Sequence, residues 1–253
     1  MERGSKSRDK IYLTLTGIAL VMCLVGMGIA LLALSSGGRA EEWETVAVED
    51  TAEEPGSPYF HVEEDMELLK KYQEYNSDVV ALIRIPDTVL NHPVMQTPSD
   101  PDFYLKHAFD KSYSSYGVPY VQENCDLLTS DNLVIYGHHI KGQKMFGALE
   151  NYKSKDFYEE HKTIRFDTLT KRGEYEIVAV FKTVAYSSAG FRYYDFVDTE
   201  DENAFNAYIA KCKELALYDT GVTAEYGDRL ITLSTCEYSA QNGRLVVVAK
   251  KVA

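Results

Sequence analysis

The sequence has only four cysteines, and no two of them form a CxxC pair. They are Cys23, Cys125, Cys212 and Cys236, and none lies at a metal-ligand spacing from a histidine. Structural zinc sites use cysteine and histidine at short, recurrent spacings, so zinc is not indicated. We expect the protein to work without a metal ion and without an organic cofactor. Once Cys23 is set apart, because it lies in an apolar run, an odd number of thiols remains for the rest of the chain.

The sequence also has little positive charge. Its 26 Lys and Arg residues stand against 39 Asp and Glu residues, which gives a formal net charge of −13 at pH 7. Proteins that bind nucleic acid present a basic face to the phosphates, so we expect no nucleic-acid partner. One tryptophan against 19 tyrosines indicates an aromatic but partly polar surface.

One long uncharged stretch lies near the N-terminus. Residues 11–34 form a run of 24 residues without a charged side chain. As a helix rising 1.5 Å per residue, the run would span roughly 36 Å, enough to cross a hydrocarbon core of about 30 Å. The apolar core of a secretory signal peptide is shorter, about 7–15 residues, although Ala33-Leu34-Ser35 resembles a weak cleavage site. The length therefore predicts an uncleaved transmembrane anchor at 11–34.

The charges on either side of this run predict its orientation. Four basic residues lie within residues 1–10, whereas Glu41 to Glu67 contains eleven acidic residues and no Lys or Arg. Basic flanks remain on the cytoplasmic side of a membrane. We therefore expect a cytoplasmic tail at 1–10, an acidic extracellular linker at 35–62 and an extracellular folded domain at 63–253. The protein would then be a single-pass protein of the cell membrane.

Short runs of β-branched and alternating apolar residues recur through the folded domain and predict about eight strands. Strands with few helices between them usually close into a barrel or a sandwich, so we expect a mainly β fold with peripheral helices. The longer helices are expected at 63–75 and 200–217, the second capped by Asp198-Thr199. The expected strands are residues 79–85, 89–96, 117–122, 132–136, 163–167, 174–185, 229–235 and 244–252.

Cys236 ends the apolar run Ile231-Thr232-Leu233-Ser234-Thr235, and a polar turn, Glu237 to Gly243, follows it at once. A cysteine at the end of a core strand is commonly a small packing residue. The turn, however, places this thiol at the mouth of the strand. Reactive thiols are accessible and lie near a cation. Cys236 is therefore a candidate nucleophile.

His138 and His139 follow the expected strand at 132–136 and Gly137. A glycine lets the chain turn sharply and would expose the next side chain at the end of the strand. An ordinary loop pair is the alternative. If one of the two lies beside Cys236, it is the candidate for proton transfer, and adjacency in the sequence does not choose between them. The other four histidines lie in contexts typical of a protein surface.

Arg244 stands at the head of an otherwise apolar strand, Leu245 to Ala249. An arginine in this position is commonly a solvated charge at a strand edge. A hairpin from Leu233 to Val248 would bring it back beside Cys236. There a guanidinium would donate hydrogen bonds to a developing oxyanion and would favour the thiolate over the thiol.

These residues resemble the signatures of the sortases, the membrane-anchored cysteine transpeptidases of Gram-positive bacteria. Thr232-Leu233-Ser234-Thr235-Cys236 is similar to their TLxTC motif, Tyr136-Gly137-His138 to their glycine-histidine pair, and Arg244-Leu245-Val246-Val247 to their last strand. The resemblance selects His138 over His139. Among the subclasses it is nearest to class B, because of Tyr-Gly-His-His followed by Met145-Phe146, Ser-Thr-Cys-Glu, the helix before the first strand, and the long helical segment at about 187–228. It covers a catalytic domain of about 63–253.

The resemblance implies an eight-stranded β-barrel and a transpeptidation. Cys236 would attack the carbonyl of a threonine in the C-terminal sorting motif of a secreted protein, which forms a thioacyl intermediate. An amine, from the lipid-linked peptidoglycan precursor or from a pilin, would then resolve it. His138 would move the protons, and Arg244 would hold the substrate and the oxyanion. Some class A sortases bind calcium through clustered carboxylates, and the sequence shows no matching cluster.

The resemblance also implies substrate-binding residues near the nucleophile. Ser234, Thr235 and Glu237 are placed to contact the sorting motif, and Leu105 matches a substrate-wall leucine. Pro101 stands where some members have a polar residue. Packing in the barrel is the alternative for these positions, and Glu237 has a further one, which is to orient His138 or a substrate amide.

Three other functions compete with an anchoring sortase. One is a sortase that polymerises pilins, and another is an extracellular cysteine peptidase that releases its product to water. The third is a surface-binding domain with an incidental thiol. L,D-transpeptidases also use a cysteine, but they require a His-Gly-Cys type motif that Leu-Ser-Thr-Cys-Glu does not match.

Overall fold

The computed structural model describes residues 61–188 and 190–253. The predicted tail at 1–10, the anchor at 11–34 and nearly all of the linker at 35–62 lie outside these residues. Helix α2 (His61–Tyr75) begins two residues before the predicted boundary at 63. The account below concerns the described residues.

The predicted location at the cell membrane needs a correction. The helices between residues 61 and 253 that the structure describes include none with the length and hydropathy required to cross a bilayer. The run 11–34, on which the prediction rests, lies outside the described part of the chain. A single-pass membrane protein with an extracellular domain is therefore a prediction that this structure does not uphold.

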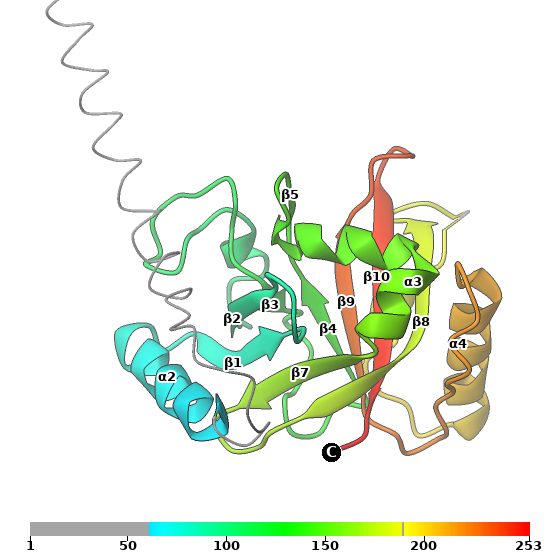
Figure 1. The fold of residues 1–253 in the computed structure, drawn as a ribbon, viewed down its shortest axis with the longest axis horizontal. Coiled ribbons are helices and arrows are strands. Elements are labelled where there is room, and N and C mark those ends of the chain that lie inside the picture. Colours follow the sequence, from blue (N-terminus) through cyan, green and yellow to red (C-terminus); the bar gives the residue numbers. More distant parts are fainter. Residues whose placement is uncertain (1–60, 189) are drawn as a thin grey trace, which may run out of the picture. The chain divides into compact units, whose positions relative to one another are not determined.

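Eight strands close a barrel in the order β1-β2-β3-β4-β9-β10-β8-β7 (Figure 1). This confirms the expected mainly β fold with an eight-stranded barrel and peripheral helices. The strands are β1 (Val79–Arg84), β2 (Asn91–Met95), β3 (Tyr120–Val121), β4 (Asn132–Tyr136), β7 (Thr163–Thr168), β8 (Glu174–Val184), β9 (Leu230–Cys236) and β10 (Gly243–Lys251).

The pairing of three strands positions the residues of interest. Most neighbours in the barrel are antiparallel, but β4 and β9 are parallel, with Tyr136 opposite Ser234. Strand β10 runs antiparallel to β9, with Arg244 directly opposite Cys236. Because parallel strands end at the same edge of a sheet, the residues after β4 and the tip of β9 meet at one end of the barrel, where β10 begins.

Strand β9 is buried along its length except at its last residue. Residues 230–235 are buried, and Cys236 is partly exposed. Its partner β10 is buried from Leu245 to Ala249. Both faces of β9 are covered, which agrees with its continuous run of β-branched and apolar residues. The burial ends where the polar turn begins.

The helices pack around the barrel (Figure 1). Helix α4 (Glu202–Leu215) packs against β8 and buries Phe205, Tyr208, Ile209 and Cys212, as its spacing predicts. The remaining helical elements are η1 (Phe103–Leu105), η2 (Phe146–Lys153), α3 (Lys155–Glu160) and η3 (Tyr193–Asp195). The sequence did not predict η3, nor the small hairpin of β5 (His139–Ile140) and β6 (Lys144–Met145).

The cap of α4 differs from the prediction. Asp201 is the capping residue, and its carboxylate accepts a hydrogen bond from the Asn203 amide at 2.9 Å. Asp198 instead accepts hydrogen bonds from the Asp131 amide and the Ser130 hydroxyl, at 3.1 Å and 3.3 Å. Asp198 therefore connects the segment before α4 to the loop before β4.

Two side chains on the strands have buried polar atoms. His92 on β2, expected at the surface, is partly exposed, but its Nε2 is buried without a partner among the described residues and burial lowers its pKa to about 4. Asn132 on β4 is fully buried, and both polar atoms of its side chain are hydrogen-bonded. Its amide donates to the Phe196 carbonyl at 2.7 Å, and its oxygen accepts from the Thr232 hydroxyl at 2.8 Å. Asn132 therefore joins β4, β9 and the segment before α4.

Replacing Asn132 with alanine should lower the free energy of unfolding by about 2–3 kcal/mol, because it leaves the Phe196 carbonyl and the buried Thr232 hydroxyl with one partner fewer. Urea unfolding followed by circular dichroism measures this. Asn203→Ala, at an exposed position on α4, is the matched control and should change stability by less than about 0.5 kcal/mol. Equal effects of the two substitutions would contradict the role given to Asn132.

Candidate active site

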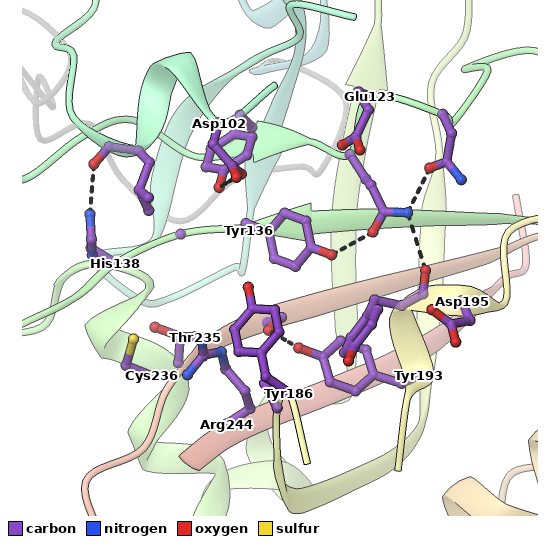
Figure 2. A pocket seen from close by; sticks show the side chains of 18 residues that line it. Asp102, Glu123, Tyr136, His138, Tyr186, Tyr193, Asp195, Thr235, Cys236 and Arg244 are labelled. Atoms are coloured by element: carbon purple, nitrogen blue, oxygen red, sulfur yellow. Dashed lines mark hydrogen bonds between the residues drawn. The ribbon is translucent and has the colours of Figure 1, made fainter. Parts of the chain in front are cut away.

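A pocket of about 580 Å³ lies at the end of the barrel where β4 and β9 terminate. His138, Cys236 and Arg244 all line it. Figure 2 shows the three side chains gathered at one end of the pocket, with Thr235 among them. The three residues expected to carry the chemistry are thus brought together from segments about 100 residues apart in the sequence.

Cys236 differs from the other described cysteines in its exposure. Cys125 and Cys212 are buried, whereas Cys236 is partly exposed, and all three are free thiols. Burial raises the pKa of the Cys125 thiol to about 11 and that of the Cys212 thiol to about 12. Since the thiolate is the nucleophile, these two thiols are inert near neutral pH. Cys236 is the one described cysteine that lines the pocket.

His138 is placed by the strand before it and oriented by a backbone atom. The Gly137 amide donates to the Ser234 carbonyl at 3.1 Å and thereby extends the β4–β9 pairing by one residue. The Nε2 atom of His138 lies 2.7 Å from the Leu105 carbonyl (Figure 2). A carbonyl oxygen accepts, so Nε2 donates, and Nδ1 is the ring nitrogen left for other partners. His139 does not line the pocket.

Gly137 is required for a different reason than expected. Its backbone is outside the left-handed region, so it does not make the sharp turn that was predicted. A Cβ atom at this position would come within 2.5 Å of the buried Phe146 ring. The glycine therefore permits Phe146 to pack directly against the backbone that carries His138.

Arg244 lies opposite Cys236 in the β9–β10 register. One guanidinium nitrogen donates to the Gly243 carbonyl at 3.0 Å. The guanidinium carbon lies 5.9 Å from the centre of the Tyr186 ring, which is within the range of a cation–π contact. Arginine has five N–H donors, so most of them remain for a group bound in the pocket.

Three of the four residues expected to bind substrate line the pocket, namely Leu105, Ser234 and Thr235. The Ser234 hydroxyl is paired with the Tyr193 hydroxyl at 2.5 Å. The Thr235 hydroxyl is buried and has no hydrogen-bond partner within the described part of the chain. Tyr186 and Tyr193 also line the pocket and were missed, because the loop around them carries no periodic pattern.

Glu237, the fourth, is not a wall of the pocket. Its side chain is 6 % exposed and pairs with Lys153 of η2, at 2.7 Å from Oε1 to Nζ. The Ser239 amide donates to its other oxygen at 3.0 Å. Burial alone would raise the pKa of Glu237, but the hydrogen bonds from Lys153 and Ser239 outweigh it and lower the pKa to about 2. The side chain thus anchors the turn that follows Cys236.

The comparisons with known proteins agree with this geometry. The family model for the sortase domain matches residues 83–252. The chain belongs to the sortase family. Among the described residues, no group of three or more His, Cys, Asp or Glu side chains of this sortase is arranged to hold a metal ion.

The relatives also identify the subclass. The chain is 33% identical to sortase B of Listeria monocytogenes over 73% of this chain and 74% of the relative. It is 29% identical to sortase B of Staphylococcus aureus over 96% of this chain and 98% of the relative. The structure of the Staphylococcus aureus sortase B–substrate complex matches with a TM-score of 0.68 and 30% identity, covering 76% of this chain and 88% of that one. The predictions of a class B sortase and of a cysteine transpeptidase are therefore confirmed.

The charge on Glu237 should contribute to the stability of this sortase above pH 4.5 and not at low pH. Its pKa falls from 4.5 to about 2 in the folded protein. The stabilisation is therefore complete above the unfolded pKa and is lost as the pH falls through the folded one. We expect Glu237→Gln to lower the free energy of unfolding by roughly 2–3 kcal/mol at pH 7, and the difference from the parent protein to shrink as the pH falls from 4.5 to 2.

Urea titrations at several pH values measure this difference. Glu214→Gln is the control, because Glu214 is an exposed residue paired with Lys211 on α4 and such pairs contribute little. A difference for Glu237→Gln that does not change between pH 7 and pH 2 would contradict the assignment.

Proposed function

We propose that this class B sortase cleaves the C-terminal sorting motif of secreted proteins after a threonine and joins the new end to an amine of the cell-wall precursor. The observation that carries the proposal is the convergence of His138, Cys236 and Arg244 on one pocket. The related Staphylococcus aureus sortase B has been solved with a substrate, which supports a peptide as the occupant of this pocket.

In the first step, the Cys236 sulfur attacks the carbonyl carbon of the threonine. A carbon–sulfur bond forms, and the carbon–nitrogen bond to the next residue breaks. Nδ1 of His138 takes the proton that the Cys236 thiol loses and donates it to the departing amine, since Nε2 is held by Leu105. The products are a thioacyl-enzyme and the released C-terminal piece.

In the second step, an amine attacks the thioester carbonyl. The new carbon–nitrogen bond forms, the carbon–sulfur bond breaks, and His138 takes the proton that the amine loses. Cys236 is regenerated, so the sum of the two steps is an exchange of one amide bond for another. The acceptor that we propose is the amine of the lipid-linked peptidoglycan precursor, with a pilin lysine as the other candidate.

The remaining pocket residues have distinct proposed roles. The free donors of Arg244 face the carbonyl that becomes an oxyanion, and they hold the substrate backbone. The unpartnered Thr235 hydroxyl supplies a hydrogen bond to the bound peptide. Leu105 forms an apolar wall, and Ser234 acts through its hydrogen bond to Tyr193. We propose no contact between Glu237 and the substrate, because Lys153 and Ser239 occupy its carboxylate.

Cys236→Ala should abolish the thioacyl adduct, and His138→Ala should nearly do so. The assay is mass spectrometry of the protein after incubation with a library of peptides that carry a threonine in an otherwise varied pentapeptide motif. Cys125→Ala is the control and should still form the adduct, because the Cys125 thiol is buried. Cleavage of any library peptide by Cys236→Ala would overturn the assignment.

The same assay separates transpeptidation from hydrolysis. With an added amine, such as a short glycine peptide, a ligated product should dominate over the free acid. A cysteine peptidase would give the free acid at every amine concentration.

Arg244→Ala should lower kcat/KM by about 10²–10³, because it removes a donor to the oxyanion. Arg244→Lys should recover only part of this loss, since an ammonium lacks the planar fork of the guanidinium. Arg165→Ala, a half-buried arginine on β7 outside the pocket, should leave the rate unchanged. Full activity of Arg244→Lys would show that charge alone suffices.

A further inference from the structure

His139 lies next to His138 but makes a different set of contacts. Its Nδ1 atom is 3.2 Å from the backbone carbonyl of Cys236. The side chain is 17% exposed and is not part of the pocket wall. Because a carbonyl oxygen accepts, Nδ1 carries the proton and donates it. The histidine beside the proposed base thus holds the backbone of the proposed nucleophile.

A second hydrogen bond runs in the opposite direction. The Tyr238 hydroxyl donates to the backbone carbonyl of His139 at 3.2 Å. The two rings also meet edge to face, with centroids 5.1 Å apart and planes inclined by 61°. We call these contacts between His139 and the segment Cys236–Tyr238 the clasp. It joins the residue after His138 to the residues at and after Cys236.

A chain of charged groups supports the clasp from the side of η2. Glu150 lies 3.5 Å from His139 Nδ1. Lys153 lies 2.5 Å from the other oxygen of Glu150 and 2.7 Å from Glu237. The Cys236 carbonyl is therefore held by His139, and the side chain that follows Cys236 is held by Lys153. Both anchors belong to the segment that begins just after His138.

The clasp begins where the pairing of β4 with β9 ends. The β4–β9 ladder ends with Tyr136 opposite Ser234, followed by the Gly137 amide on the Ser234 carbonyl. His138 and Cys236 both lie beyond this last contact between β4 and β9, while Cys236 remains paired with Arg244 of β10. A displacement of about 1 Å between reacting groups can cost about 10²-fold in rate. Other contacts hold each residue separately, namely the Leu105 carbonyl for His138 and the β10 pairing for Cys236. The clasp is a direct contact between the two segments beyond the β4–β9 ladder, so it limits the distance between imidazole and sulfur.

We propose that His139 is a positioning residue for the transpeptidation, which holds the Cys236 backbone so that the thiol stays within reach of His138. The inference rests on the roles proposed above for Cys236 and His138. His139 itself moves no proton in the reaction and touches no substrate.

The test compares two substitutions of His139. Leucine fills the space but removes the donor, whereas asparagine keeps an N–H close to the position of Nδ1. His139→Leu should lower kcat about 10- to 100-fold with little change in KM, and should slow the alkylation of Cys236 by iodoacetamide at pH 7. His139→Asn should recover most of both rates. If His139 served only in folding, we would not expect a lower kcat with an unchanged KM in the leucine variant together with recovery of kcat in the asparagine variant.

His161→Leu is the matched control. Its Nδ1 lies 2.9 Å from the Phe157 carbonyl and its ring stacks on Phe157 at 4.1 Å, outside the pocket. This substitution removes the same kind of contact and should leave kcat and the alkylation rate unchanged. An equal loss in both leucine variants would contradict a specific role for His139.

Tyr238→Phe tests the clasp from its other end, and it decides the matter if His139→Leu fails to fold. Tyr238 is 74% exposed, so removal of its hydroxyl should leave the fold intact. We expect a decrease in kcat of about 3- to 10-fold. The inference about His139 would be overturned if Tyr238→Phe and a folded His139→Leu both kept the kcat and the alkylation rate of the parent protein. The proposed function would still stand in that case, provided that Cys236→Ala loses the thioacyl adduct. An adduct that persists in Cys236→Ala would instead remove the proposed function itself.

Discussion

The parallel pairing of β4 and β9 is the constraint on which the site depends. Tyr136 lies opposite Ser234, so the chain leaves both strands at the same end of the barrel, and the residues that follow are His138 and Cys236. An antiparallel pair would send one of them to the far end. The antiparallel neighbour β10 then returns with Arg244 opposite Cys236. The strand pairing thereby brings His138, Cys236 and Arg244 to one pocket.

Burial separates the Cys236 thiol from the other two described thiols. Strand β9 is covered until its last residue, so the thiol at its tip is partly exposed at the pocket while the rest of the strand stays in the core. Cys125 and Cys212 pack inside, where burial keeps them protonated. The barrel therefore carries three free thiols in its described part and presents one of them to the pocket.

Much of this architecture is visible in the sequence because it depends on local patterns. The strands and α4 follow from the spacing of apolar residues, and Cys236 stands out because a polar turn interrupts an apolar run. The hairpin β5–β6 was missed because two residues in each strand give no period to detect. The position of Glu237 directly after Cys236 predicts a substrate contact, and its pairing with Lys153, 84 residues away in the sequence, cannot be inferred from that position. Hydrogen bonds to backbone atoms that depend on the tertiary fold, such as the one from His138 to the Leu105 carbonyl, cannot be predicted from the sequence, because every residue has the same carbonyl.

Leu105 contributes to the site in two separate ways, through its backbone carbonyl and through its side chain. Its backbone oxygen orients the imidazole of His138, and its side chain forms part of the pocket wall. Gly117 lies beside this contact, where a Cβ atom would come within 2.9 Å of the Leu105 carbonyl and 3.2 Å of the His138 ring. Since every residue type has the same carbonyl, the contact that orients the imidazole does not depend on which side chain stands at position 105. The proposed peptide preference of this wall and the proposed proton transfer by His138 therefore depend on different atoms of one residue.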